Sequence, residues 1–207
     1  MEVIRYGLAL SWVARPSFTR EPWFFHPPRH EESSLNRHLV IPRFHLESAL
    51  TIMSSLKQGD WIVGIDIKDA YIHVVIHPEF RKYLHLAFLG KVYRFRVLPF
   101  GGATASYVST RLVTAMASAI RLGGVKFHRY LDDWLIVGDS VQQVQRSVGI
   151  VLELAVRLGW IPNGEKSGLT PTQCLVHVGI EYDLEKGLYF FPQSSGCPSW
   201  TVWRQRF

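Results

Sequence analysis

The sequence predicts an α+β fold in which an antiparallel sheet carries helices packed on one of its faces. Two observations predict it. Short apolar runs of strand-forming residues follow one another in pairs that tight turns connect. Two long segments between these pairs repeat apolar residues at helical spacing, which indicates amphipathic helices. A chain of 207 residues is long enough to bury a sizeable hydrophobic core.

Composition narrows the class of protein further. Apolar residues make up 47% of the chain and charged residues 19%, which excludes a disordered protein. The net charge of +6 favours an anionic partner, with nucleic acid as the first candidate. No run approaches the roughly 18 apolar residues that a membrane span needs, so we expect no membrane partner. The two cysteines show no metal-binding spacing, and we expect an intracellular protein, cytoplasmic or nuclear.

The chain divides into a lead-in, a central domain and a tail. Residues 1–34 mix aromatic residues with several prolines and show no period, so we expect an irregular lead-in. Residues 35–192 contain the regular patterns. Residues 193–207 show no period, and we expect an irregular tail.

The elements expected within the central domain can be stated in order. The patterns predict helices at 46–56, 104–122 and 141–158, the last capped by Ser140. They predict strands at 61–67, 71–76, 83–88 and 92–98, then a hairpin around 127–138. A last hairpin is expected from 175–182 and 187–191, with a turn at 184–186.

Two adjacent carboxylates, Asp132 and Asp133, interrupt the apolar hairpin at 127–138. Aspartate is seldom buried and is depleted in strands, so this doublet costs stability. An ordinary Asp-Asp turn is one interpretation. A metal site for phosphoryl transfer is the other.

A second apolar strand carries a carboxylate in the same setting, at Asp66. If the two strands are neighbours, the carboxylates converge and repel one another unless a cation lies between them. Mg²⁺ or Mn²⁺ prefers such oxygen ligands, and two ions are the standard device for phosphoryl displacement. Because strand residues alternate in direction, only one residue of the doublet would face Asp66. We expect Asp132 to be that ligand and Asp133 to have a supporting role at the turn.

Several segments together resemble the reverse transcriptase family. The doublet lies in a segment similar to the YxDD box, and Asp66 lies in one similar to the first catalytic motif. The loop 98–101 resembles the opening of the next motif, and 159–167 resembles the lysine-bearing motif that follows YxDD. The strand pair at 177–180 resembles the primer grip. These segments occur along the chain in the family's order. From the N-terminus they are Asp66-Ile67-Lys68-Asp69-Ala70-Tyr71, Leu98-Pro99-Phe100-Gly101, Tyr130-Leu131-Asp132-Asp133, Gly159-Trp160 with Lys166, and His177-Val178-Gly179-Ile180.

The resemblance implies a polymerase palm with partial fingers, and it implies roles around the metals. Asp66, Asp132 and Asp133 would bind two Mg²⁺ or Mn²⁺ ions, and Ile67 would offer its backbone carbonyl. Lys166 would approach the triphosphate and stabilise the leaving group. A solvated loop lysine is the alternative for Lys166.

The resemblance also implies substrate-binding residues. Tyr71 would lie beneath the incoming sugar and reject a 2′-hydroxyl, which selects deoxynucleoside triphosphates. Phe100 and Gly101 would lie near an RNA or DNA template and its primer. A core tyrosine and a plain turn are the respective alternatives. One departure from the family pattern is Ser106, which stands where the family usually has proline.

The function implied is an RNA-directed DNA polymerase that extends a primer 3′-hydroxyl. The amino-acid sequences of the motifs resemble those of DIRS-like or long-terminal-repeat retrotransposons. The chain ends about where the family's thumb would begin, so we expect a fingers-palm fragment. The alternatives are a catalytically inactive nucleic-acid-binding remnant of such an element, and an unrelated α+β protein with accidental motifs.

Overall fold

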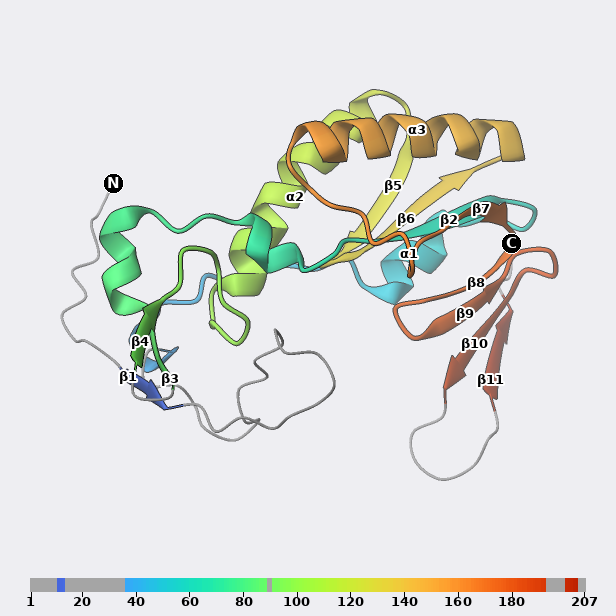
Figure 1. Cartoon of the computed structure of the whole chain (residues 1–207). Helices are drawn as coiled ribbons and strands as arrows, with labels where there is room; N and C mark the ends of the chain where they lie inside the picture. The colour runs from blue at the N-terminus through green and yellow to red at the C-terminus, as the bar shows by residue number, and fades with distance from the viewer. Residues whose placement is uncertain (1–10, 14–35, 89–90, 193–199, 205–207) are drawn as a thin grey trace. The chain divides into compact units, whose positions relative to one another are not determined.

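The structure is a computed structural model that describes residues 11–13, 36–88, 91–192 and 200–204. The chain forms two compact units (Figure 1). The first unit contains residues 1–44 and 71–109, and the second contains 45–70 and 110–207. Among the described residues, no helix is both long enough and apolar enough to span a membrane.

The first unit is built on a small sheet with the strand order β1-β3-β4. β1 (Ser11–Val13) pairs parallel to β3 (His85–Phe88), and β4 (Lys91–Arg94) pairs antiparallel to β3. β1 lies inside the segment that we predicted to be irregular, and the rest of 1–34 lies outside the described residues. The described residues of this unit also form 3₁₀ helices at Asn36–His38 and Pro78–Tyr83, and most of the one at Ala70–His73.

The strand predicted at 71–76 is wrong. Val74 N–H donates to the carbonyl of Tyr71 at 3.1 Å, which closes a 3₁₀ turn. Leu98 N–H then donates to the carbonyl of Val74, at 2.9 Å. Val74, Leu98 and Ala105 bury their side chains together, so tertiary contacts override the strand preference of the segment.

The second unit is built on an antiparallel sheet of four strands with the order β5-β6-β2-β7. β2 and β6, the central strands, are the apolar runs that carry the aspartates. β5 and β7 form the edges, and Pro171 in β7 suits an edge strand because it cannot donate to a neighbour. The strands are β2 (Trp61–Asp66), β5 (Lys126–Tyr130), β6 (Asp133–Gly138) and β7 (Gly168–Thr172).

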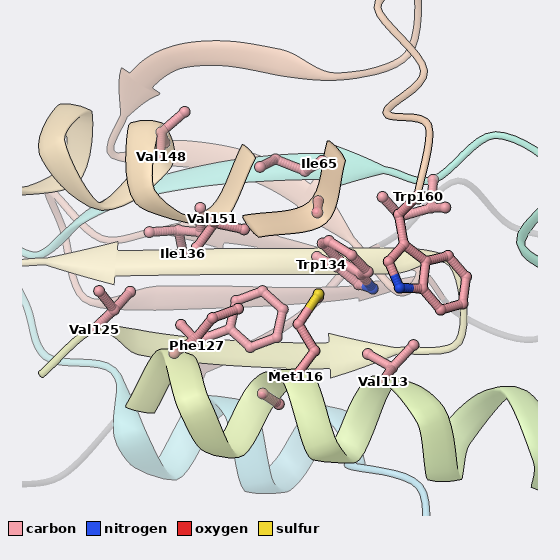
Figure 2. Close-up of a cluster of buried hydrophobic side chains, with 14 of the residues drawn as sticks. Ile65, Val113, Met116, Val125, Phe127, Trp134, Ile136, Val148, Val151 and Trp160 are labelled. Atoms are coloured by element: carbon pink, nitrogen blue, oxygen red, sulfur yellow. The ribbon is translucent and has the colours of Figure 1, made fainter. Parts of the chain in front are cut away.

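Two long helices cover one face of this sheet, as the α+β prediction requires (Figures 1 and 2). They are α2 (Ala105–Leu122) and α3 (Val141–Arg157). The predicted cap of α3 is confirmed, because Ser140 Oγ accepts a hydrogen bond from Gln143 N–H at 3.3 Å. Trp134 is fully buried at the centre of the cluster, with its ring 5.5 Å from that of Phe127.

The other face of the sheet is covered by α1 (Ala49–Ser55) and by a second antiparallel sheet. That sheet has the order β11-β10-β9-β8 and replaces the single hairpin predicted at 175–191. The predicted strand 175–182 divides at Val178 and Gly179, whose φ angles are +50° and +75°. The tail predicted to be irregular contains β11. The strands are β8 (Cys174–His177), β9 (Ile180–Asp183), β10 (Leu188–Pro192) and β11 (Trp200–Arg204).

His177 makes the stability of the second unit depend on pH. Its side chain is buried, and its Nε2 has no hydrogen-bond partner among the described residues. Burial, with a smaller effect of His128, lowers the pKa of His177 from 6.5 to about 4. The unfolded chain therefore binds a proton between pH 6.5 and 4 that the folded chain does not, and His177 destabilises the fold as pH falls through that window.

We expect this effect of His177 to reach about 3 kcal/mol at pH 4. The measurement is urea unfolding at several pH values for wild type and for His177→Gln. The free energy of unfolding of wild type should fall relative to that of the variant between pH 7 and pH 4. His77→Gln removes an exposed histidine and should leave the pH profile unchanged. Parallel profiles for wild type and His177→Gln would contradict the assignment.

Candidate active site

The end of the central strand pair brings two of the predicted carboxylates face to face. Asp66 is the last residue of β2 and Asp133 the first of β6, and the two are directly opposite in the antiparallel register. Residues directly opposite one another point to the same face of a sheet. Ile65 and Trp134, their neighbours, point to the helix-covered face, so both carboxylates lie on the opposite face.

Asp132 lies in the turn, and Asp133, for which we expected a supporting role at the turn, directly follows it as the first residue of β6. β5 ends at Tyr130 and β6 begins at Asp133, so Leu131 and Asp132 form a two-residue hairpin loop. Leu131 has a φ of +52°, in the left-handed region that costs a non-glycine residue about 1–2 kcal/mol. Because Asp132 is outside the strand, strand alternation does not decide which way its side chain points.

The three carboxylates are electrostatically coupled. Burial, followed by the charges of Asp132 and Asp66, raises the pKa of Asp133 from 3.8 to about 6. Burial, followed by the charge of Asp66, also raises the pKa of Asp132, although its backbone hydrogen bonding opposes this. Lys166 lowers both pKa values. The predicted catalytic residues Asp66, Asp132, Asp133 and Lys166 therefore belong to one electrostatic site.

Backbone hydrogen bonds tie Asp66 to the loop that carries Lys166. Asn163 N–H donates to the carbonyl of Asp66 at 2.8 Å. Asp66 N–H donates to Ser167 Oγ at 3.1 Å. The sequence placed Ser167 with Asn163 and Lys166 in the motif at 159–167, but it did not reveal this hydrogen bond to Asp66.

Ile67 joins β2 to the turn. Its N–H donates to the carbonyl of Asp132 at 2.9 Å, and its side chain is buried among the apolar residues under α2 and α3. The backbone of the predicted carbonyl ligand is thus held directly against the backbone of the doublet. Its role as a metal ligand stays a prediction.

The chemistry of these donors fits a hard divalent cation. Carboxylates that raise one another's pKa are stabilised by a positive ion between them, and oxygen ligands suit Mg²⁺ or Mn²⁺. Among the described residues, no group of three or more His, Cys, Asp or Glu side chains is positioned to hold a metal ion. The residues that would hold the cation are Asp66, Asp132, Asp133 and the carbonyl of Ile67.

The predicted substrate-binding residues gather in the first unit. Tyr71 stacks edge-on against Phe100, with ring centroids 5.1 Å apart. Its hydroxyl lies 3.0 Å from Ser106 Oγ, so the serine that departs from the family pattern has a contact that sequence reasoning missed. Gly101 has a φ of +82°, which favours glycine, and its carbonyl accepts a hydrogen bond from Asn36 Nδ2 at 3.0 Å.

Two solved structures resemble this fold. One is a foamy viral protease-reverse transcriptase in complex with double-stranded DNA, with a TM-score of 0.65 and 18% identity over 72% of this chain and 25% of that one. The other is the foamy viral protease-reverse transcriptase in complex with an RNA/DNA hybrid, with a TM-score of 0.66 and 17% identity over 74% of this chain and 20% of that one.

Curated relatives and a family model agree with that likeness. Protein P of duck hepatitis B virus (strain United States/DHBV-16) is 24% identical over 144 residues, which are 69% of this chain and 17% of the viral protein. Protein P of the strain from China is also 24% identical, over 18% of its length. The chain thus spans less than a fifth of these relatives. Residues 27–182 match the family model described as reverse transcriptase (RNA-dependent DNA polymerase), and the chain belongs to that family.

Proposed function

We propose that this chain is the part of an RNA-directed DNA polymerase that adds deoxynucleotides to a primer 3′-hydroxyl. The observation that carries the proposal is the coupled set of Asp66, Asp132 and Asp133 at the ends of neighbouring strands, in a chain of the reverse transcriptase family. Two Mg²⁺ or Mn²⁺ ions would be the cofactors. An RNA or DNA template with its primer and deoxynucleoside triphosphates would be the substrates.

The residues of the site would have separate roles in binding the metal ions and the triphosphate. Bound divalent ions supply Lewis-acid activation of the hydroxyl and neutralise charge on the triphosphate. Asp66, Asp132, Asp133 and the Ile67 carbonyl would hold them. Lys166 lowers the pKa values of Asp132 and Asp133 through its positive charge. It would donate hydrogen bonds to the triphosphate and stabilise the leaving pyrophosphate. Asn163 and Ser167 keep the Lys166 loop against Asp66.

The parent protein would be encoded by a mobile element of the DIRS-like or long-terminal-repeat type. The support is the amino-acid sequence of two motifs, Asp66-Ile67-Lys68-Asp69-Ala70-Tyr71 and Leu98-Pro99-Phe100-Gly101. Such a polymerase would work inside the cell, in the cytoplasm or nucleus.

Primer extension on an RNA template with Mg²⁺ or Mn²⁺ tests the proposal. We expect wild type to extend the primer and Asp132→Asn to leave it unextended. Equal signals from the two proteins would refute the proposal. Salt-sensitive binding of the primer-template without synthesis would instead identify an inactive nucleic-acid-binding remnant.

Tyr71 offers a test of substrate selection. If its ring rejects a 2′-hydroxyl, Tyr71→Val should raise ribonucleotide incorporation relative to deoxynucleotide incorporation by about tenfold or more. The measurement is the ratio of kcat/KM for the two triphosphates. Tyr93→Val, which removes an exposed tyrosine of the same unit, should leave the ratio unchanged. An unchanged ratio in Tyr71→Val would leave Tyr71 a purely structural residue.

A further inference from the structure

Among the described strands, β5 is an edge of the central sheet, and it leads directly into the turn that carries Asp132. Tyr130 and Asp133 flank the two-residue turn and form a hydrogen-bonded pair. Hydrogen bonding alternates along an antiparallel pair, so Phe127 and Arg129 direct their backbone groups away from β6. Edge groups of this kind must find other partners.

An ion pair between Glu47 and Arg121 supplies partners for two of these groups, the Arg129 N–H and the Phe127 carbonyl. Arg129 N–H donates to Glu47 Oε2 at 3.4 Å. Arg121 Nε and Nη2 donate to the carbonyl of Phe127 at 2.9 and 2.7 Å, and Nη2 also donates to Glu47 Oε1. The two side chains therefore occupy the place that a further strand would take along β5. We call Glu47 and Arg121 the edge pair.

The edge pair is anchored on both sides. Arg121 belongs to the last turn of α2, the helix beside β5 in Figure 2. Glu47 immediately precedes Ser48, the N-cap of α1. His128 Nδ1 lies 3.0 Å from Glu47 Oε2, which adds a second contact between Glu47 and β5. Hydrogen bonds to ionised groups are stronger than neutral ones, and this carboxylate is mostly buried.

A Ser-His-Glu catalytic triad is a different interpretation of the same residues, and the hydrogen bonds oppose it. Ser55 Oγ lies 2.7 Å from His128 Nε2, and His128 contacts Glu47. The Ser55 hydroxyl, however, also lies 2.7 Å from the carbonyl of Ile52, which can accept its one proton. That carbonyl competes with His128 Nε2 for the proton, whereas a serine activated by its histidine would direct the proton to the imidazole.

The position of Asp132 depends on the edge pair more than the position of Asp133 does. Asp133 belongs to β6, which β2 and β5 hold on both sides. Asp132 belongs to the turn, whose backbone depends on β5 and on the hydrogen bond from Ile67 N–H to the Asp132 carbonyl. Leu131 beside it is in a conformation that persists only where its surroundings fix it.

We infer that Glu47 is a positioning residue of the active site, which acts with Arg121 to fix the end of β5 and thereby to place Asp132. This inference rests on the proposed polymerase function, in which Asp132 binds a metal ion. Glu47 acts through the backbone of β5 and touches neither metal nor substrate. Residues that orient metal ligands typically contribute about 10–100-fold to metal affinity or activity.

The test compares Glu47→Ala with wild type by two measurements that need no turnover. Mn²⁺ affinity, from water proton relaxation, should weaken by about tenfold. Exchange of the Arg129 amide hydrogen, followed by NMR, should accelerate because its acceptor is lost. Glu153→Ala is the matched control, since Glu153 pairs with Arg157 at 4.0 Å on the exposed face of α3, and it should change neither quantity. Should Glu47→Ala fail to fold, Glu47→Gln carries the Mn²⁺ comparison alone, because it keeps an oxygen for Arg129 but loses the charge that holds Arg121.

The outcomes of these measurements separate the positioning role of Glu47 from the polymerase function. A folded Glu47 variant with wild-type Mn²⁺ affinity overturns the inference, and so does unchanged exchange at Arg129 in Glu47→Ala. Primer extension separates the inference from the function on which it rests, with kcat expected to fall in the Glu47 variant and KM for the triphosphate to stay constant. A wild-type protein whose Mn²⁺ affinity depends on Glu47 but which extends no primer refutes the polymerase function and leaves the positioning role. A wild-type protein that binds no Mn²⁺ overturns both.

Discussion

Asp66→Asn should reduce primer extension by about 10³-fold or more, because metal ions at such a site contribute several kcal/mol of transition-state stabilisation. Asp66 lies opposite Asp133 and raises the pKa values of both residues of the doublet. An amide keeps the shape of the side chain but removes the negative charge that holds a cation. The measurement is the single-turnover rate of addition of one deoxynucleotide.

Asp69→Asn is the matched control for that loss. Asp69 is three residues further along, with a φ of +50° in a region that asparagine tolerates well, so the substitution should leave fold and rate unchanged. Equal losses in the two variants would show that the rate responds to any charge change in this segment. A wild-type rate in Asp66→Asn would remove Asp66 from the catalytic site.

Asp133→Asn should stabilise the protein while it disables the site. The pKa of Asp133 is about 6 in the folded chain against 3.8 for an ordinary aspartate, so the ionised group destabilises the fold above pH 6. The variant should gain about 1–2 kcal/mol in the free energy of unfolding at pH 8 without divalent ions, less than the full pKa shift corresponds to, because solvent screens this half-buried carboxylate. Below pH 6 the folded wild type binds a proton that relieves the repulsion, so the gain should shrink and vanish near pH 4.

Urea unfolding at a series of pH values measures this gain. Asp139→Asn is the control, because Asp139 is exposed and pairs with Lys126 at 3.0 Å, and its effect should stay within about 0.5 kcal/mol. Mn²⁺ should stabilise wild type and not Asp133→Asn, since the cation would replace the repulsion by attraction. A variant less stable than wild type at pH 8 would contradict the electrostatic account of the doublet.

The helices and the central strands could be predicted because local pattern and tertiary packing agree there. The apolar period of α3 matches the side chains that it buries against the sheet, and Ser140 caps it as its residue type suggests. The continuous apolar run of β2 reflects burial on both faces. The α+β fold with two long helices on one face is therefore confirmed.

The errors arise where the backbone adopts a conformation that the residue type does not announce. Val178 is β-branched, yet it has a positive φ in the turn between β8 and β9, a position that usually calls for Asn or Gly. Leu131 does the same before Asp132, and this turn removes Asp132 from the strand alternation by which we expected it, and not Asp133, to face Asp66. The contacts of Glu47 could not be predicted because its partners lie 74 to 82 residues away in the chain.

Anomalous scattering from crystals soaked in Mn²⁺ tests the central claim most directly. We expect anomalous peaks bounded by the carboxylates of Asp66, Asp132 and Asp133, and the loss of these peaks in Asp66→Asn. Peaks that lie elsewhere, or that persist unchanged in Asp66→Asn, would contradict the assignment of these residues as the metal-binding centre of a polymerase.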